Sequence, residues 1–203
     1  MVDFDPNEQF WYIGSQAFVI GARFLRRTSL VDRARPILRR LMEQTGETAN
    51  RGIEREGAVL FVSQVETHAI IRAFFPPRTL SPMHASGIGK ALLAQMDDDR
   101  QHRVLPGQNF ERFTEYTLAD IDQLRENLTQ IRKAGFSVDD EERNLGMLCI
   151  AAPVFDVSEE AVAGISVSWL ISRVGQDDIL RLSGAVREAA QELSLAIGGK
   201  GHL

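Results

Sequence analysis

The chain has 203 residues, a formal net charge of -5, 44% hydrophobic and 25% charged residues. This length suits one substantial domain, or a domain plus a small appendage, and the composition is that of an ordinary globular protein. An acidic chain is a poor candidate for gripping nucleic acid by itself, because phosphate contacts need clustered Lys and Arg. The single cysteine excludes an internal disulfide and a thiolate-rich zinc site, and no apolar run reaches membrane-spanning length. We therefore expect a cytoplasmic protein without a metal, a cofactor or a membrane partner.

The first 28 residues are predicted to form an appendage to the main domain. Residues 1–9 are polar and expected to fray, whereas Phe10-Trp11-Tyr12-Ile13-Gly14 has the pattern of a short strand. Apolar residues then recur at helical spacing from Ala17 to Leu25. This helix either packs on its own domain or serves as a linker or dimerisation helix whose upstream neighbour is missing.

Residues 29–199 are predicted to form the main domain, followed by a tail at 200–203. Ser29 can cap a first helix, and Gly46 can end it. Strand-like runs follow at 47–55, 58–65 and 68–75. Further helices are expected at 84–96, from Asp97, from Thr117 to Gly135 and from Asp177 to Gly198, with strands at about 136–141, 147–155 and 161–168.

The order of these elements indicates the fold class. Strands come in two groups of three, each bracketed by helices, and short turns favour antiparallel pairing over repeated parallel units. The expected fold is α+β, with one curved antiparallel sheet and helices on its faces.

Two glycines at the start of the helix after residue 84 indicate a possible anion site. Gly87 and Gly89 leave backbone N–H groups accessible, and a helix N-terminus attracts negative charge. The sequence predicts a small carboxylate with its anionic end at the N–H groups of Gly87, Ile88 and Gly89. The alternative is that the glycines only let the helix pack closely on a strand.

Two pairs of small side chains are predicted to face this turn. Ser166 and Ser168 are two residues apart on a strand, so both point the same way, as do Met147 and Cys149 on a neighbouring strand. Together they would line a pocket with apolar surface and two hydroxyls. Alternatively, each pair faces a helix in the core.

An acidic run contributes a further candidate. Strand alternation would turn Asp139 and Glu141 to one face, and Asp140 and Glu142 to the other. Such runs usually form a solvated face, but one carboxylate can instead serve as a pocket acceptor.

An enzyme would need a different arrangement, with Cys149 as nucleophile, His84 as base and Asp139 orienting it. Cys149 lies among apolar neighbours, where a cysteine is normally a small buried hydrophobe. The four histidines are isolated and lack metal-ligand spacing. The enzyme interpretation is therefore the weaker one.

Three segments together resemble the C-terminal effector-binding domain of IclR-type bacterial transcription regulators. They are His84–Ala94, Asp139–Phe155 and Ile165–Ser168, and the resemblance covers roughly residues 10–199. It implies a profilin- or GAF-like fold that binds a small metabolite, often a carboxylate. It also implies a winged helix-turn-helix before this domain, of which residues 10–14 would be the end. DNA would then be bound only through a domain absent from this chain.

The resemblance also implies where the effector binds. In the family's archetype, small oxo-acids bind at positions that fall here on Gly87, Ile88, Asp139, Met147, Cys149, Ser166 and Ser168, with Leu80 at an apolar wall. Two positions depart from the pattern: Arg72 falls near a hydrophobic wall, and Trp169 stands where the family usually has Gly.

Three functional classes follow. The leading hypothesis is a ligand-sensing domain of a transcription regulator, forming a homodimer or tetramer through the Ala17–Leu25 helix or the sheet edges. The alternatives are a small-molecule enzyme using Cys149 and a pure oligomerisation module.

Overall fold

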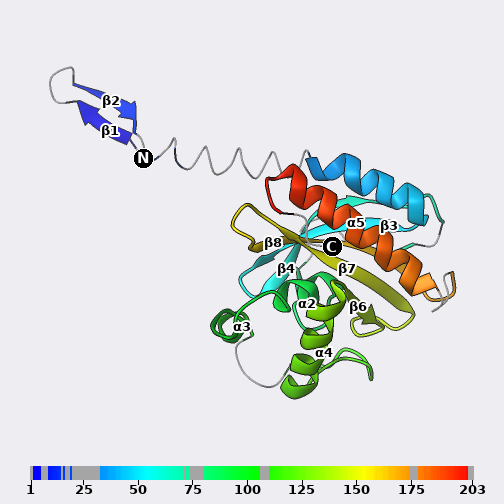
Figure 1. Cartoon of the computed structure of the whole chain (residues 1–203). Helices are drawn as coiled ribbons and strands as arrows, with labels where there is room; N and C mark the ends of the chain where they lie inside the picture. Colours follow the sequence, from blue (N-terminus) through cyan, green and yellow to red (C-terminus); the bar gives the residue numbers. More distant parts are fainter. Residues whose placement is uncertain are drawn as a thin grey trace.

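A six-stranded antiparallel sheet with helices on both faces forms the body of the chain (Figure 1). The computed structural model describes residues 2–5, 9–14, 16, 19, 33–70, 72–73, 80–105, 110–173 and 178–200. The expected α+β class, with a curved antiparallel sheet flanked by helices, is confirmed.

The sheet has the strand order β5-β4-β3-β8-β7-β6, and all neighbouring strands are antiparallel. Register shifts between Arg51 and Gly52, and between Val154 and Phe155, mark irregularities of the kind that bend and twist a sheet. The strands are β3 (Thr48–Arg55), β4 (Ala58–Val65), β5 (Leu80–Pro82), β6 (Ser137–Asp140), β7 (Met147–Phe155) and β8 (Ala161–Leu170).

The predicted strand at 68–75 is wrong for the described part of that range. Residues 68–70 and 72–73 form no strand, and the short β5 takes the place beside β4. Just before this segment, threonine side chains form hydrogen bonds with backbone groups. Thr48 Oγ1 accepts from the Thr67 N–H, and Thr67 Oγ1 donates to Gly46 O. Such local bonds compete with strand pairing.

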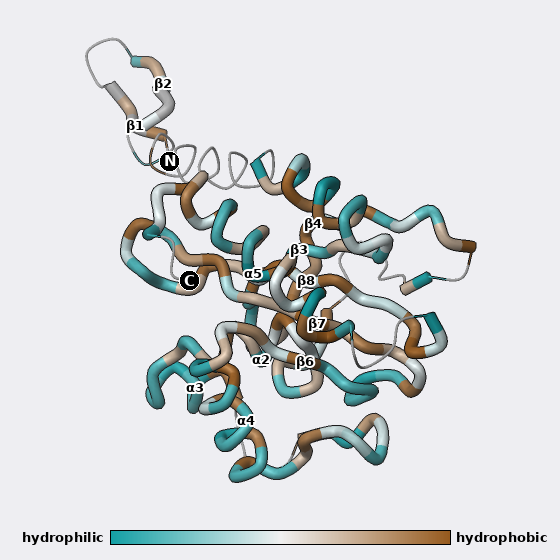
Figure 2. Tube along the Cα trace, turned by 45° about the vertical axis from the view of Figure 1, so that its right-hand side comes forward, coloured by the Kyte–Doolittle hydropathy of each residue, from teal (hydrophilic) through white to brown (hydrophobic). Residues whose placement is uncertain are grey.

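Helices cover the two faces of the sheet in separate groups. Helix 33–45 and α5 (Ile179–Ala196) lie on one face, and the ion pair between Arg40 and Glu192 links them. The other face carries α2 (Gly87–Leu93), α3 (Asp98–Val104) and α4 (Ile121–Ala134) (Figure 1). Figure 2 shows hydrophobic residues gathered where strands and helices meet, and hydrophilic ones on the outer turns of α3 and α4.

Strand alternation divides the buried residues into two cores. Ile150 and Ala152 of β7 pack with α5 and helix 33–45, whereas Ala151 between them packs with α2 and α4. Ile88, Leu92 and Leu128 belong to this second core. The α2 side of the sheet is the side on which the candidate site lies.

Two helices begin later than the sequence pattern indicated. Ser86 caps α2 by accepting from the Gly89 N–H, so the helix starts at Gly87 rather than at residue 84. Asp120 caps α4, while Thr117 instead donates its hydroxyl to Glu142 O (2.7 Å). The predicted end of α4 at Gly135 is confirmed, with φ +76° in the left-handed region.

The N-terminal residues form a hairpin of β1 (Val2–Asp5) and β2 (Phe10–Ile13). The strand at Phe10 is as predicted, but the expected fraying is wrong for residues 2–5, which pair with it. The Ala17–Leu25 helix lies outside the described residues apart from Val19, and so does the boundary between residues 28 and 29. Of the helices that are described, none is long and apolar enough to cross a membrane.

Candidate functional site

A small cavity of about 20 Å³ lies where α2 begins, beside β6 and β7. Asp139, Met147 and Cys149, three of the residues singled out by sequence, line it. A volume of this size holds a single water molecule. The remaining lining residues are Phe61, Ser81, Ser86, Arg143, Asn144 and Leu148.

The register of three strands brings the predicted residues onto one face. Asp139 of β6 is opposite Cys149 of β7, and Cys149 is opposite Ser168 of β8. Ser166 is opposite Ala151, one pleat further along β7. The two serines therefore lie behind Cys149, beside the residues that line the cavity.

The start of α2 closes this face from above. A Cβ added to Gly87 would lie 2.9 Å from Cys149 Sγ, so the bare backbone lets helix and thiol approach closely. Gly89 is packed more tightly still, since a Cβ there would lie 2.2 Å from Met83 O. The Ile88 side chain points into the core, where its methyl groups touch Gly52 and Gly164. Because the Gly89 amide is used by Ser86, it is the least available of the three amides considered as an anion site.

Three other residues lie away from the cavity lining. Leu80 is 57% exposed on the edge strand β5. Arg72 is ion-paired with Glu66 at 2.6 Å. Trp169 is fully buried in the core on the opposite face of the sheet, so its ring does not reduce the cavity.

A buried charge cluster adjoins the cavity, and two of its members were not predicted. Lys90 is fully buried, and its Nζ donates to Val138 O (2.6 Å) and to Glu142 Oε1. The second oxygen of Glu142 has no hydrogen-bond partner among the described residues. Asp139 accepts from the Glu142 N–H at 3.0 Å. Two carboxylates thus share the neighbourhood of one ammonium.

Glu142 was missed because strand alternation fails at the preceding residue. β6 ends at Asp140, and Glu141 has φ +58°, in the left-handed region. The turn directs Glu142 inward to Lys90 instead of to solvent. The signal available in sequence was Gly146 soon after the acidic run, which indicates a turn there.

Burial changes the proton affinity of both carboxyls. Burial raises the pKa of Asp139 to about 6, although the charge of Lys90 opposes the shift. Burial likewise raises the pKa of Glu142 to about 7, opposed by the charge and hydrogen bond of Lys90. The cluster therefore exchanges protons near neutral pH.

The enzyme arrangement is not assembled in the described residues. Burial, reinforced by the charge of Asp139, raises the pKa of Cys149 to about 12, although the nearby hydroxyls of Ser168 and Ser166 oppose the shift. A thiol in that state is a poor nucleophile. His84 lies near Phe110 and Phe113, and its Nε2 hydrogen-bonds to Glu111 O at 3.0 Å.

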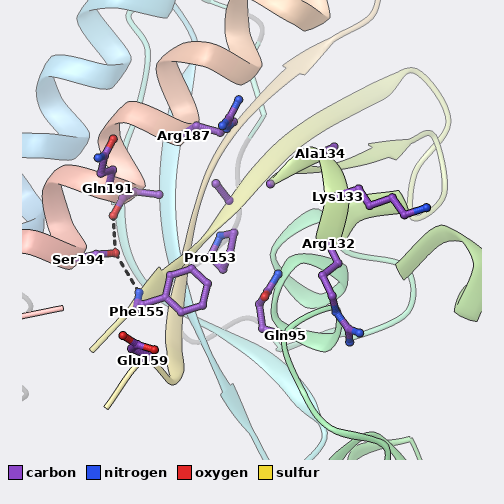
Figure 3. Close-up of a pocket in the computed structure, with 13 residues that line it drawn as sticks. Gln95, Arg132, Lys133, Ala134, Pro153, Phe155, Glu159, Arg187, Gln191 and Ser194 are labelled. Carbon is purple, nitrogen blue, oxygen red and sulfur yellow. Dashed lines mark hydrogen bonds between the residues drawn. The ribbon is translucent and has the colours of Figure 1, made fainter. Parts of the chain in front are cut away.

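A second, larger hollow of about 330 Å³ lies between the end of α4, β7 and α5 (Figure 3). It has the greater volume, but its charged groups do not converge. The side chains of Arg132, Lys133 and Arg187 point in three different directions (Figure 3). The Arg132 Nε–H already donates a hydrogen bond to Ala94 O at 2.6 Å. The smaller cavity is therefore the better candidate, because several polar groups meet around it.

Comparisons with known proteins agree with this architecture. Residues 22–195 match the family described as "Bacterial transcriptional regulator IclR C-terminal". The chain is 55% identical over 193 residues to the HTH-type transcriptional regulator BhcR of Paracoccus denitrificans, covering 95% of this chain and 69% of that protein. It is 40% identical over 191 residues to the transcriptional repressor IclR of Escherichia coli, covering 93% of this chain and 70% of that protein.

A solved structure shows the same fold. The C-terminal domain of the E. coli transcriptional regulator KdgR matches with a TM-score of 0.76 and 29% identity, over 84% of this chain and 99% of that one. Together with the family match over most of the chain, this similarity identifies the protein: it belongs to the IclR family of bacterial transcriptional regulators, and its main body is the family's C-terminal ligand-sensing domain.

Proposed function

We propose that this domain senses a small carboxylate, which binds at the cavity around Cys149. The support is the convergence there of Asp139, Met147 and Cys149, with Ser166 and Ser168 behind the thiol. The bare backbone of Gly87 approaches the Cys149 sulfur at the same place, which leaves room for no side chain between them. Leu80 and Arg72 would take part only if the neighbouring segment moved toward the cavity.

The observation that carries this proposal is the state of Ser166. Its side chain is fully buried, and apart from the Cys149 thiol, which is a weak hydrogen-bonding group, its Oγ has no partner among the residues described. Buried hydroxyls are nearly always well bonded, so one left with only a weak thiol partner beside a cavity indicates a missing partner. An oxygen of an effector would supply it.

Binding must enlarge the cavity, because its 20 Å³ accommodates only one water. Met147 is the most adaptable lining side chain, and Arg143 and Asn144 come from the turn after β6. That turn is tied to the segment before α4, since Thr114 Oγ1 donates to Glu141 O at 2.7 Å. We infer that effector binding displaces this pair of loops and that the displacement is the signal.

A thermal-shift panel of small acids tests the proposal. A ligand at 100 times its dissociation constant stabilises the folded state by about 2.7 kcal/mol, which is a clear upward shift in Tm. Gly87→Val should abolish the shift, because its side chain would enter the space of the Cys149 sulfur. If the variant is folded and responds to an acid as the parent does, the acid binds elsewhere.

DNA binding and assembly belong to the whole regulator. We propose that DNA is contacted only through a winged helix-turn-helix preceding these residues, and that the protein is a homodimer or tetramer. Paired half-sites on DNA require such symmetry. Sedimentation at high micromolar concentration checks the assembly, and a strict monomer would count against it.

The two alternatives make different predictions. An enzyme using Cys149 would lose an activity on Cys149→Ser, and the raised thiol pKa and the position of His84 argue against it. A pure oligomerisation module would show no thermal response to any acid. We propose that the domain is a sensor and not a catalyst.

A further inference from the structure

A chain of hydrogen bonds crosses three strands behind the cavity. Gln64 of β4 donates from Nε2 to Asn50 Oδ1 of β3 at 2.9 Å. Asn50 in turn donates from Nδ2 to Ser168 Oγ of β8 at 3.3 Å. Asn50 is fully buried and Ser168 is 1% exposed, so these bonds are largely shielded from water.

The chain of bonds has a direction. An amide oxygen only accepts and an amide nitrogen only donates, so the bond from Gln64 leaves Asn50 presenting its NH₂ to the serine. Ser168 therefore accepts from Asn50, and its own hydrogen remains to be donated elsewhere. A buried hydroxyl hydrogen needs an acceptor.

The available acceptor lies on the cavity side. Cys149 is the cross-strand neighbour of Ser168 and lines the cavity. Cross-strand partners point to the same face of a sheet, so the Ser168 hydroxyl and the thiol lie side by side on the cavity face. A ligand oxygen displacing the thiol contact would meet the same hydrogen.

We propose that Gln64 and Asn50 fix Ser168 as a hydrogen-bond donor toward Cys149 and the cavity, so that the site selects effectors presenting an acceptor at that end. This selectivity rests on the proposed effector site. The direction of the hydrogen bonds from Gln64 through Asn50 to Ser168, here called the relay, does not. Gln64 and Asn50 are positioning residues, since neither lines the cavity. Their polarity, and not only their shape, would set the specificity.

Reversing the relay is the test. In Gln64→Glu the new carboxylate only accepts, so Asn50 must turn its NH₂ toward β4 and its oxygen toward Ser168. Ser168 then donates to Asn50 and no longer to the thiol. Gln95→Glu is the matched control, because it adds the same charge beside the other hollow.

The first readout needs no ligand. The chain has one cysteine, so its infrared spectrum contains a single S–H stretching band. We expect this band to shift in Gln64→Glu and to stay in place in Gln95→Glu. An unchanged band in a Gln64→Glu protein that melts cooperatively would overturn the relay. Asn50→Asp imposes the same reversal from the next position and must shift the band in the same direction.

The second readout is the affinity ratio of pyruvate to lactate by calorimetry. Pyruvate carries a keto oxygen, which only accepts, where lactate carries a hydroxyl. Each acid has one negative charge, so the repulsion that the carboxylate introduced by Gln64→Glu adds is the same for both and cancels in the ratio. We expect the parent to favour pyruvate and the ratio to fall about two- to tenfold in Gln64→Glu, the value of one hydrogen bond. An unchanged ratio would overturn the selectivity. If neither acid nor any other carboxylate binds the parent, the proposed effector site fails, and the S–H band alone then decides the relay.

Discussion

Ser166 and Ser168 present two buried hydroxyls on the same face of β8, and among the described residues only Ser168 has a nitrogen or oxygen partner. Replacing both by Ala should weaken carboxylate binding by about 1–3 kcal/mol, because ligand oxygens would lose partners in a site shielded from water. That is roughly a five- to 150-fold loss of affinity by calorimetry.

Ser183→Ala is the control for this pair. Ser183 is also buried, but it lies on α5 at the other face of the sheet and donates to Leu180 O. It should leave affinity unchanged. Equal binding by the parent and the folded double variant would place the effector away from β8.

The pair Asp139 and Glu142 predicts how stability depends on pH. Both pKa values are higher in the folded state than the ordinary 3.8 and 4.5, at about 6 and about 7. The folded protein therefore holds protons more tightly than the unfolded chain. This contribution to stability is complete below about pH 4 and is lost as pH rises to about 7.

Asp139→Asn should flatten this dependence in denaturant titrations across that pH window, because one of the two groups no longer titrates. Asp140→Asn is the matched control, since Asp140 is the exposed neighbour on the same strand. A parent whose stability rises steadily from pH 4 to 7 would refute the assignment.

Two glycines in helices show how the surrounding packing decides whether a Gly→Ala substitution stabilises or destabilises the protein. At Gly89 of α2 a Cβ would lie 2.2 Å from a backbone oxygen, whereas at Gly184 of α5 nothing lies within 4 Å. Gly89→Ala should destabilise by about 1–3 kcal/mol through overpacking. Gly184→Ala should stabilise by about 0.5–1 kcal/mol, because Ala favours the helix. Urea unfolding compares them, and shifts of the same sign would contradict the packing described.

The sequence predicted those elements whose signals are local. The strands predicted at about 147–155 and 161–168 coincide with β7 and β8, and Gly135 marked the end of α4. That Ser166 and Ser168 share a face followed from alternation alone, whereas the register between β7 and β8 places Cys149 on that face. These features depend on backbone geometry that neighbouring residues determine.

Features that depend on distant partners could not be read in this way. In the segment expected as a strand at 68–75, Ala73 O accepts from the Thr48 hydroxyl and the Ala69 N–H donates to Thr67 Oγ1, and the partner at Thr48 is met only in the fold. The ion pair of Lys90 with Glu142 depends on the turn at Glu141, which brings Glu142 against it from a distant part of the sequence. The relay from Gln64 likewise exists only because β3 lies between β4 and β8.

At the scale of the whole molecule, the charge of -5 bears on DNA. We expect these 203 residues alone to show no sequence-specific DNA binding in a gel-shift assay, since phosphate contacts need clustered cations. Nanomolar, sequence-dependent binding at physiological salt would contradict this. A helix-turn-helix repressor on its own operator is the positive control for the assay.

The account centres on the cavity beside Cys149 as the effector site, although a larger hollow exists beside α5. A crystal structure with a stabilising carboxylate bound distinguishes the two directly. The account predicts ligand density in contact with Cys149 and Ser168, an enlarged cavity and a displaced Met147. Density confined to the hollow beside Arg187, with the Cys149 cavity unchanged, would contradict it.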